Sequence, residues 1–234
     1  MTKIIYRISD AGFSKQKPKY IDNRNCLWNA VNAFPLDKHD WLVLADSVSD
    51  ETKQIIEGYI PKENVEYIQI KNGPGYPFMC ALDKVIEMES DDTIIYFLEN
   101  DYMHRLGADV VLEEGINLGA DYVTLYDHPD KYINGVDGGN PFIDDGGEVT
   151  KVFLTKSSHW KFTNSTTGTF AARVAVLKRD YEIIKKYANN PYWNDFHMFT
   201  ELLQNQRSLI SCIPGYSTHG ETAWLTPLID WQTV

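Results

Sequence analysis

The alternation of apolar strands with helical segments in the first hundred residues most narrows the folds open to this chain. Short apolar runs have strand character, and the segments between them space their apolar residues three and four apart, as helices do. Strands that alternate with helices form a parallel sheet with helices on its faces. We therefore expect an α/β fold. The predicted strands are 3–8, 41–45, 65–70 and 93–98, and the predicted helices are 23–34, one that opens at 49–52, and 78–88.

The second half of the chain continues with a less regular pattern. We expect it to be an irregular α+β half that packs on the same sheet, so that residues 1–234 form one domain. Residues 134–147 are rich in glycine and aspartate, which is typical of a loop. The other predicted elements are helices at 109–118, 179–187 and 194–204, strands at 122–126, 150–154, 168–176 and 209–213, and a loop at 214–221.

Composition restricts the classes of partner. The chain has 234 residues and a formal net charge of -11, which argues against nucleic acid or an anionic membrane as the main partner. Its three cysteines have no metal-type spacing, so a reducing compartment is expected. No signal peptide and no apolar run near the length of a membrane span is present, which predicts a cytoplasmic protein.

An acidic pair follows the apolar run that ends at Leu98. Glu99 and Asp101 are two residues apart, so on an extended chain they point to the same side. Two carboxylates at the end of a buried strand make an oxygen site suited to Mg²⁺ or Mn²⁺, at the sheet edge where open α/β folds bind ligands. The alternative is a strand that simply leaves the core through a polar turn.

Three further residues have both a functional and a structural interpretation. Asp46 ends the second predicted strand, where it can bind ribose or base, or favour the following helix N-terminus. His219 lies in a polar loop and would add an imidazole that favours Mn²⁺, or it is simply exposed. Asp195 begins a helix, where it is either an N-terminal cap or a general base.

The order of these motifs along nearly the whole chain resembles that in the family-two-like glycosyltransferases with a GT-A fold. Residues 46–52 look like the aspartate-rich turn of that family, and Asn72-Gly73 is similar to its next loop. Glu99-Asn100-Asp101 stands where the family carries its Asp-X-Asp metal motif, with Glu in place of the first Asp. Asn194-Asp195 looks like the acidic pair that supplies the base, with Asn in place of the first acid, and residues 217–219 resemble the late metal-binding histidine segment.

The resemblance implies a fold and an activity. The fold is a mostly parallel Rossmann-like sheet flanked by helices, with a nucleotide-sugar-binding half at 1–101 and an acceptor and catalytic half at 102–234. The activity is sugar transfer from a UDP-sugar, with UDP-glucose as one candidate, to a carbohydrate or other hydroxyl. Inversion is expected, and retention stays open. The chain is similar in size to small bacterial and phage enzymes of this kind.

The implied residues fall into four groups. Asp195 is the expected base, and Asp101, His219 and Glu99, the last directly or through water, hold Mn²⁺ or Mg²⁺. The expected donor-binding residues are Arg7, Ser9, Asp46, Asn72, Gly73 and Asn100, and the expected acceptor-binding residues are Trp160, Thr167, Gly168 and Trp193.

Three other functions remain to be weighed. A sugar-phosphate nucleotidyltransferase shares the α/β nucleotide fold, but residues 8–12 lack the glycine- and arginine-rich phosphate loop of that class. A non-catalytic carbohydrate-binding module would use exposed tryptophans, and leaves the acidic pair and His219 unexplained. A metal-dependent hydrolase normally has more closely spaced histidines or carboxylates.

Overall fold

A computed structural model describes residues 2–10, 15–70, 75–189 and 193–234. Its centre is a nine-stranded sheet in the order β3-β2-β1-β4-β9-β6-β10-β8-β7. The predicted α/β architecture is confirmed, and β8 and β9 run against the direction of the other strands. The strands of this sheet are β1 Thr2–Ser9, β2 Asp40–Asp46, β3 Val65–Ile68, β4 Ile94–Glu99, β6 Tyr122–Thr124, β7 Val152–Leu154, β8 His159–Phe162, β9 Phe170–Arg173 and β10 Leu209–Ile213.

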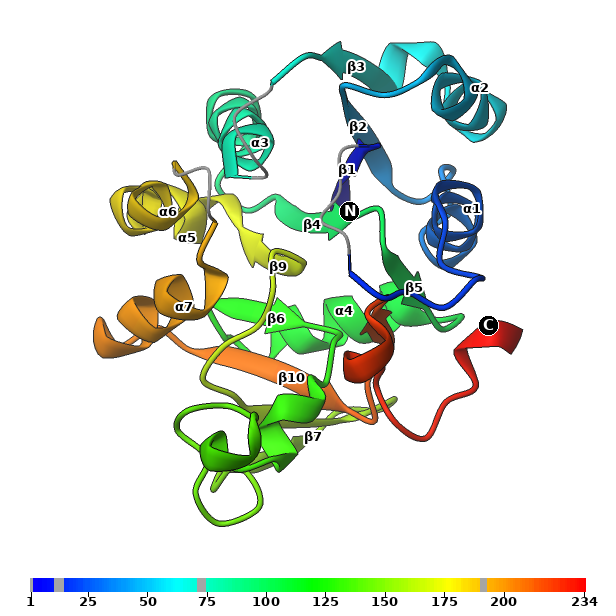
Figure 1. Cartoon of the computed structure of the whole chain (residues 1–234). Helices are drawn as coiled ribbons and strands as arrows, with labels where there is room; N and C mark the ends of the chain where they lie inside the picture. Colours follow the sequence, from blue (N-terminus) through cyan, green and yellow to red (C-terminus); the bar gives the residue numbers. More distant parts are fainter. Residues whose placement is uncertain (1, 11–14, 71–74, 190–192) are drawn as a thin grey trace.

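Helices cover both faces of this sheet (Figure 1). On one face, α1, α2 and α4 pack with residues such as Leu27, Ile56 and Leu112. On the other, α3, α6 and α7 pack with residues such as Leu82 and Leu202. The helices are α1 Asn23–Ala33, α2 Asp50–Tyr59, α3 Gly75–Met88, α4 Ala108–Asn117, α5 Val174–Arg179, α6 Tyr181–Ala188 and α7 Asp195–Gln204, with short 3₁₀ turns η1 Lys62–Asn64, η2 Pro129–Tyr132, η3 Gly135–Asp137, η4 Thr222–Trp224 and η5 Trp231–Thr233.

The first four strands, β1 to β4, are parallel, and their apolar side chains pack on both faces of the sheet. In β1, Ile4 and Tyr6 enter one core and Ile5 enters the other, as the two-residue period of a strand buried on both faces requires. Asp22 accepts a hydrogen bond from the Asn25 amide at 2.8 Å and so caps the start of α1. These four strands end at one edge of the sheet, so the residues just after them lie near one another.

Several boundaries differ from the sequence-based predictions. The strand predicted at 168–176 ends at Arg173, and α5 takes its last residues. The helix predicted at 179–187 is divided at Asp180, whose carboxylate is held by Arg179, Arg207 and Tyr122. The helix predicted at 78–88 begins earlier, because α3 starts at Gly75.

A second sheet was not predicted. β5, Tyr102–His104, and β11, Ser217–His219, form an antiparallel pair in which His219 is opposite Tyr102. The predicted loop at 214–221 therefore contains a strand. This small sheet brings the chain after β4 next to a segment more than a hundred residues later, and so positions the site described below.

Candidate active site

The acidic turn after β4 and the strand β11 meet at one point. The Nε2 atom of His219 lies 3.2 Å from Oδ2 of Asp101, and both side chains are largely buried. Pairing of β5 with β11 fixes this contact, and the amide of Gly220 donates a 2.7 Å hydrogen bond to the Asp101 carbonyl. A Cβ at position 220 would lie 2.7 Å from that carbonyl and 2.5 Å from Ile21, so only glycine allows the approach.

Asp101 is held as a carboxylate. Burial raises the pKa of Asp101. The hydrogen bond and charge of His219 and the ammonium of Lys17 lower it by more, so the pKa lies below its ordinary value. The Lys17 Nζ is 2.9 Å from the same Oδ2 oxygen. The Asp101 carboxylate is therefore paired with a cationic group, the ammonium of Lys17, in this structure.

The Asp101–His219 pair fits a divalent metal ion. Two neighbouring ligands of an octahedral ion, each about 2.1 Å from it, lie about 3 Å apart, close to the separation of these two atoms. A carboxylate with an imidazole suits Mn²⁺. Within the described ranges, no group of three or more such side chains is arranged to hold a metal. Mg²⁺-type ions are commonly held by one or two protein ligands together with substrate phosphates, so a pair is sufficient.

Glu99 has a different partner. Its Oε1 is 3.0 Å from the guanidinium of Arg7, which is only 7% exposed. Arg7 also donates a 3.4 Å hydrogen bond to the Gly168 carbonyl and lies against the rings of Phe78 and Trp193. Glu99 and Asp101 thus diverge: the first is an ion-pair partner in an aromatic pocket, and the second is the candidate metal ligand.

Asp195 lies at the start of α7 in the same region. Burial raises its pKa to about 6, and the neighbouring negative charge of Glu99 contributes to the rise. Its Oδ1 accepts a 2.8 Å hydrogen bond from the Phe196 amide, while Asn194 caps the helix by accepting from the His197 amide. The cap is therefore Asn194, and Asp195 is a desolvated carboxyl whose pKa suits a general base.

The other predicted donor residues are held in polar networks at the strand ends. Asp46 is buried and accepts hydrogen bonds from the Ile70 amide at 2.7 Å and the Ser47 hydroxyl at 2.9 Å. The Asn100 side-chain amide donates to the Ser9 carbonyl at 3.2 Å and to Asn23 at 2.6 Å. Asn72 and Gly73 lie outside the described residues.

The predicted acceptor residues divide into two groups. Trp193 stacks beside Arg7, and Thr167 hydrogen-bonds the hydroxyl of Tyr102 next to His219. Trp160 is wrong as an acceptor residue, because it is 0% exposed and its indole ring fills the space above Gly115. Its N–H donates to Thr155 at 3.1 Å, which satisfies its only polar atom.

Sequence reasoning missed several residues of this edge. Asp10 directly follows β1 and accepts from the Ser49 amide at 2.6 Å and the Thr52 hydroxyl at 2.8 Å, so its place after a strand was the available signal. Phe142, 59% exposed, stacks on Phe196 beside Asp195. Lys15 and Lys17 also lie at this edge, where they pair with Glu221 and Asp101. No local sequence pattern predicts these long-range contacts.

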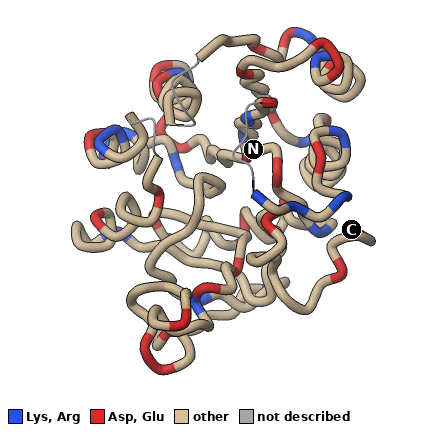
Figure 2. The backbone as a smooth tube through the Cα atoms, in the orientation of Figure 1, with Lys and Arg blue, Asp and Glu red and all other residues tan. Residues whose placement is uncertain are grey.

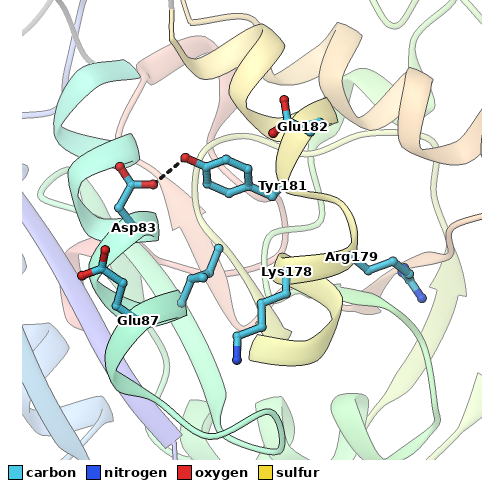
Figure 3. A pocket seen from close by; sticks show the side chains of 7 residues that line it. Asp83, Glu87, Lys178, Arg179, Tyr181 and Glu182 are labelled. Atoms are coloured by element: carbon cyan, nitrogen blue, oxygen red, sulfur yellow. Dashed lines mark hydrogen bonds between the residues drawn. The ribbon is translucent and has the colours of Figure 1, made fainter.

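A hollow also lies away from this edge. A depression of about 520 Å³ is lined by the second half of α3 and by α5 and α6, including Asp83, Lys178 and Tyr181 (Figure 3). Tyr181 donates to Asp83 at 2.7 Å, and Lys178 pairs with Asp91, which precedes β4. This places the hollow toward the start of β4, away from its carboxyl end. Its two cations pair with carboxylates outside the hollow, Lys178 with Asp91 and Arg179 with Asp121 and Asp180, so we assign no function to it.

Comparisons with known proteins identify the fold. No protein-family model and no curated protein sequence matches the chain. The crystal structure of S. aureus TarS 1–349 matches with a TM-score of 0.56 and 21% identity over 93% of this chain and 60% of that one. GalNAc-T7 with UDP, GalNAc and Mn²⁺ matches with a TM-score of 0.57 and 12% identity over 90% of this chain and 42% of that one.

A third matching structure is that of a synthetase bound to CTP. The CMP:2-keto-3-deoxy-manno-octonic acid synthetase complexed with CTP has a TM-score of 0.50 and 13% identity, with 92% of each chain covered. The chain spans 60% and 42% of the TarS and GalNAc-T7 structures. Within the described residues no helix is long and apolar enough to cross a membrane. On sheet order, helix layers and these matches, the chain has the GT-A fold of the glycosyltransferases.

Proposed function

We propose that this chain is a glycosyltransferase that moves a sugar from a UDP-sugar to an acceptor hydroxyl with the help of Mn²⁺ or Mg²⁺. The observation that carries the proposal is that two unlike carboxyl groups lie near His219 at one sheet edge. Asp101, beside His219, is kept ionised, whereas burial raises the pKa of Asp195 to about 6. A cation-binding carboxylate close to a carboxyl suited to proton transfer matches the two needs of sugar transfer.

The reaction assigns a task to each residue. The acceptor oxygen forms a bond to the anomeric carbon while the bond from that carbon to the diphosphate oxygen breaks, and UDP leaves. Asp195 takes the acceptor proton, and attack from the face opposite the leaving group gives inversion. Asp101 and His219 would hold the metal, which neutralises negative charge on the departing diphosphate when bound. Arg7, paired with Glu99, and the residues at the ends of β1 and β2 are the proposed surroundings of the nucleotide.

The acceptor side is proposed from the residues around Asp195. Trp193 and Thr167 remain from the predicted set, and Gly168 contributes its carbonyl to Arg7. Phe142 adds an exposed ring stacked on Phe196. Aromatic faces bind the apolar faces of sugar rings, so this side suits a carbohydrate acceptor.

The test is calorimetric titration of UDP with and without Mn²⁺. Wild type should bind UDP only with the metal, and Asp101→Asn should lose at least about tenfold in affinity, as for loss of a metal-linked charge. Asp92→Asn, which changes an exposed carboxylate just before the amino end of β4, is the matched control and should bind like wild type. Equal UDP affinity with and without Mn²⁺ in wild type would remove the metal role.

A nucleotidyltransferase is the second candidate, because the CTP-bound synthetase is covered over 92% of both chains. It predicts binding of a nucleoside triphosphate and release of pyrophosphate. Titration with CTP and UTP beside UDP, followed by a pyrophosphate-release assay with sugar phosphates, separates the two. Preference for UDP together with UDP release from a UDP-sugar supports the transferase. A carbohydrate-binding module would bind sugar and none of these nucleotides.

A further inference from the structure

A basic segment, Lys15–Lys19, lies along the candidate metal pair. The Nζ of Lys17 is 2.9 Å from Oδ2 of Asp101, and the Nζ of Lys15 is 2.7 Å from Oε2 of Glu221. His219 stands between the two carboxylates, with Nε2 at 3.2 Å from Asp101 and Nδ1 at 3.9 Å from Glu221. Two ammonium groups thus face two carboxylates on either side of one imidazole.

The backbone of this basic segment is anchored on both sides of Lys17. The Gln16 carbonyl accepts a 2.9 Å hydrogen bond from the Thr222 amide, and the Pro18 carbonyl accepts one of 3.0 Å from the Ile21 amide. Ile21 is buried with Trp231 in a small core of its own. The segment and the C-terminal part of the chain run side by side in Figure 1. Because the backbone is held, movement of the ammonium is restricted to the reach of the lysine side chain.

The negative charge of this sheet edge suggests a second role for these lysines besides their ion pairs. The chain carries a net charge of -11, and Glu99, Asp101, Asp195 and Glu221 all contribute acid to this edge. A diphosphate entering here meets repulsion unless cations are present. Arg7 is paired with Glu99, whereas Lys15 and Lys17 place their ammonium groups beside the metal pair. The lysines of the basic segment are blue in Figure 2.

We propose that Lys17, assisted by Lys15, binds the diphosphate of the donor, and that without donor Lys17 holds the Asp101 oxygen that a metal ion takes. This inference rests on the proposed function. A metal ion and the ammonium of Lys17 compete for the same oxygen of Asp101, so metal binding releases the ammonium. The anchored backbone keeps the released ammonium beside the metal, where the diphosphate lies.

The proposal predicts effects of opposite sign for one substitution. In Lys17→Gln, Mn²⁺ alone should bind about two- to fivefold more tightly, since a partly exposed ion pair no longer competes. UDP in saturating Mn²⁺ should bind about ten- to a hundredfold more weakly, since a charge-assisted hydrogen bond to phosphate is lost. UMP, which lacks the second phosphate, should lose less affinity than UDP.

The experiment measures Mn²⁺ binding by electron paramagnetic resonance of the free ion, and UDP and UMP binding by calorimetry. Lys19→Gln, an exposed lysine of the same segment, is the matched control and should resemble wild type in all three. Thermal unfolding verifies that each variant is folded. The expected result is tighter Mn²⁺ binding with weaker UDP binding in Lys17→Gln alone.

Two outcomes overturn the inference without touching the proposed function. Wild type binds UDP with Mn²⁺, and Lys17→Gln either binds UDP equally well or loses affinity for both Mn²⁺ and UDP. The first removes the diphosphate contact, and the second means that Lys17 supports the metal pair rather than competes for it. If wild type binds no UDP at any Mn²⁺ concentration, the proposed function fails and the role of Lys17 fails with it.

Discussion

Replacement of Asp195 by Asn should stabilise the protein above pH 6 while it removes the proposed base. Burial, with the charge of Glu99, raises the pKa of Asp195 from 3.8 to about 6 in the folded chain. Ionisation is therefore unfavourable in the folded state. The stabilising contribution of this carboxyl is fully present below pH 3.8 and is lost as the pH rises through about 6.

The magnitude follows from the two pKa values. Each unit between them is worth about 1.36 kcal/mol, so the full effect of this group on the unfolding free energy is about 3 kcal/mol. About 2.4 kcal/mol of it is lost between pH 4 and pH 7.5, because Asp195 is already partly ionised in the unfolded chain at pH 4. Asn has the same shape and keeps an oxygen to accept the 2.8 Å bond from the Phe196 amide. The difference between Asp195→Asn and wild type should then grow by about 2.4 kcal/mol over this range.

Urea denaturation followed by far-ultraviolet circular dichroism, at half-unit steps from pH 4 to 7.5, measures this difference. Asp92→Asn is the control, because its carboxylate is exposed in the folded chain. Its curve should run parallel to that of wild type. The reasoning is refuted if the Asp195→Asn curve also stays parallel to wild type, because the carboxylate would then pay no penalty for burial.

Three further predictions concern the reaction and the core. The rate of sugar transfer by wild type should rise with pH through about 6, as Asp195 loses its proton, and a pH–rate profile that is flat from pH 5 to 7 would contradict its role as base. Gly115→Ala should lower the unfolding free energy by about 1–3 kcal/mol, because the new Cβ would lie 2.5 Å from the buried ring of Trp160; an unchanged urea midpoint would mean that the ring moves freely. Tyr122→Phe should cost about 1–2 kcal/mol, because its hydroxyl donates a 2.9 Å bond to the buried carboxylate of Asp180, and equal stability by the same denaturation would show that the two arginines on Asp180 satisfy it alone.

Local sequence patterns were sufficient for the first half of the fold. The strand ending at Glu99 and the helix capped by Asp22 are readable because a buried strand and a capped helix are determined by neighbouring residues. β5 and β11 have three residues each, too few for a period to appear, and each is a strand only because the other is its partner. Pairings of this kind are set by the tertiary fold and not by propensity.

The candidate site was predictable where chemistry is carried by residue type at a strand end. Asp101, Asp195 and His219 were all singled out by their positions in the sequence, and the resemblance assigned each of them an expected role. The sequence could not show that Glu99 has Arg7 as its partner, because this ion pair joins two neighbouring strands. Trp160 was misjudged for a related reason: whether a tryptophan faces a ligand or the core depends on the room left opposite it, here by a glycine on α4.

The separation of Asp101 and His219 along the chain sets the order in which the site is assembled. The two residues are 118 positions apart. A ribosome adding about 5–20 residues per second therefore makes Asp101 about 6–24 seconds before His219. During that interval the nascent chain already contains Lys17, the cation that lies on Asp101 in the finished fold. The carboxylate has its ammonium partner available first and its imidazole last, so the metal pair is complete only when β11 has joined β5.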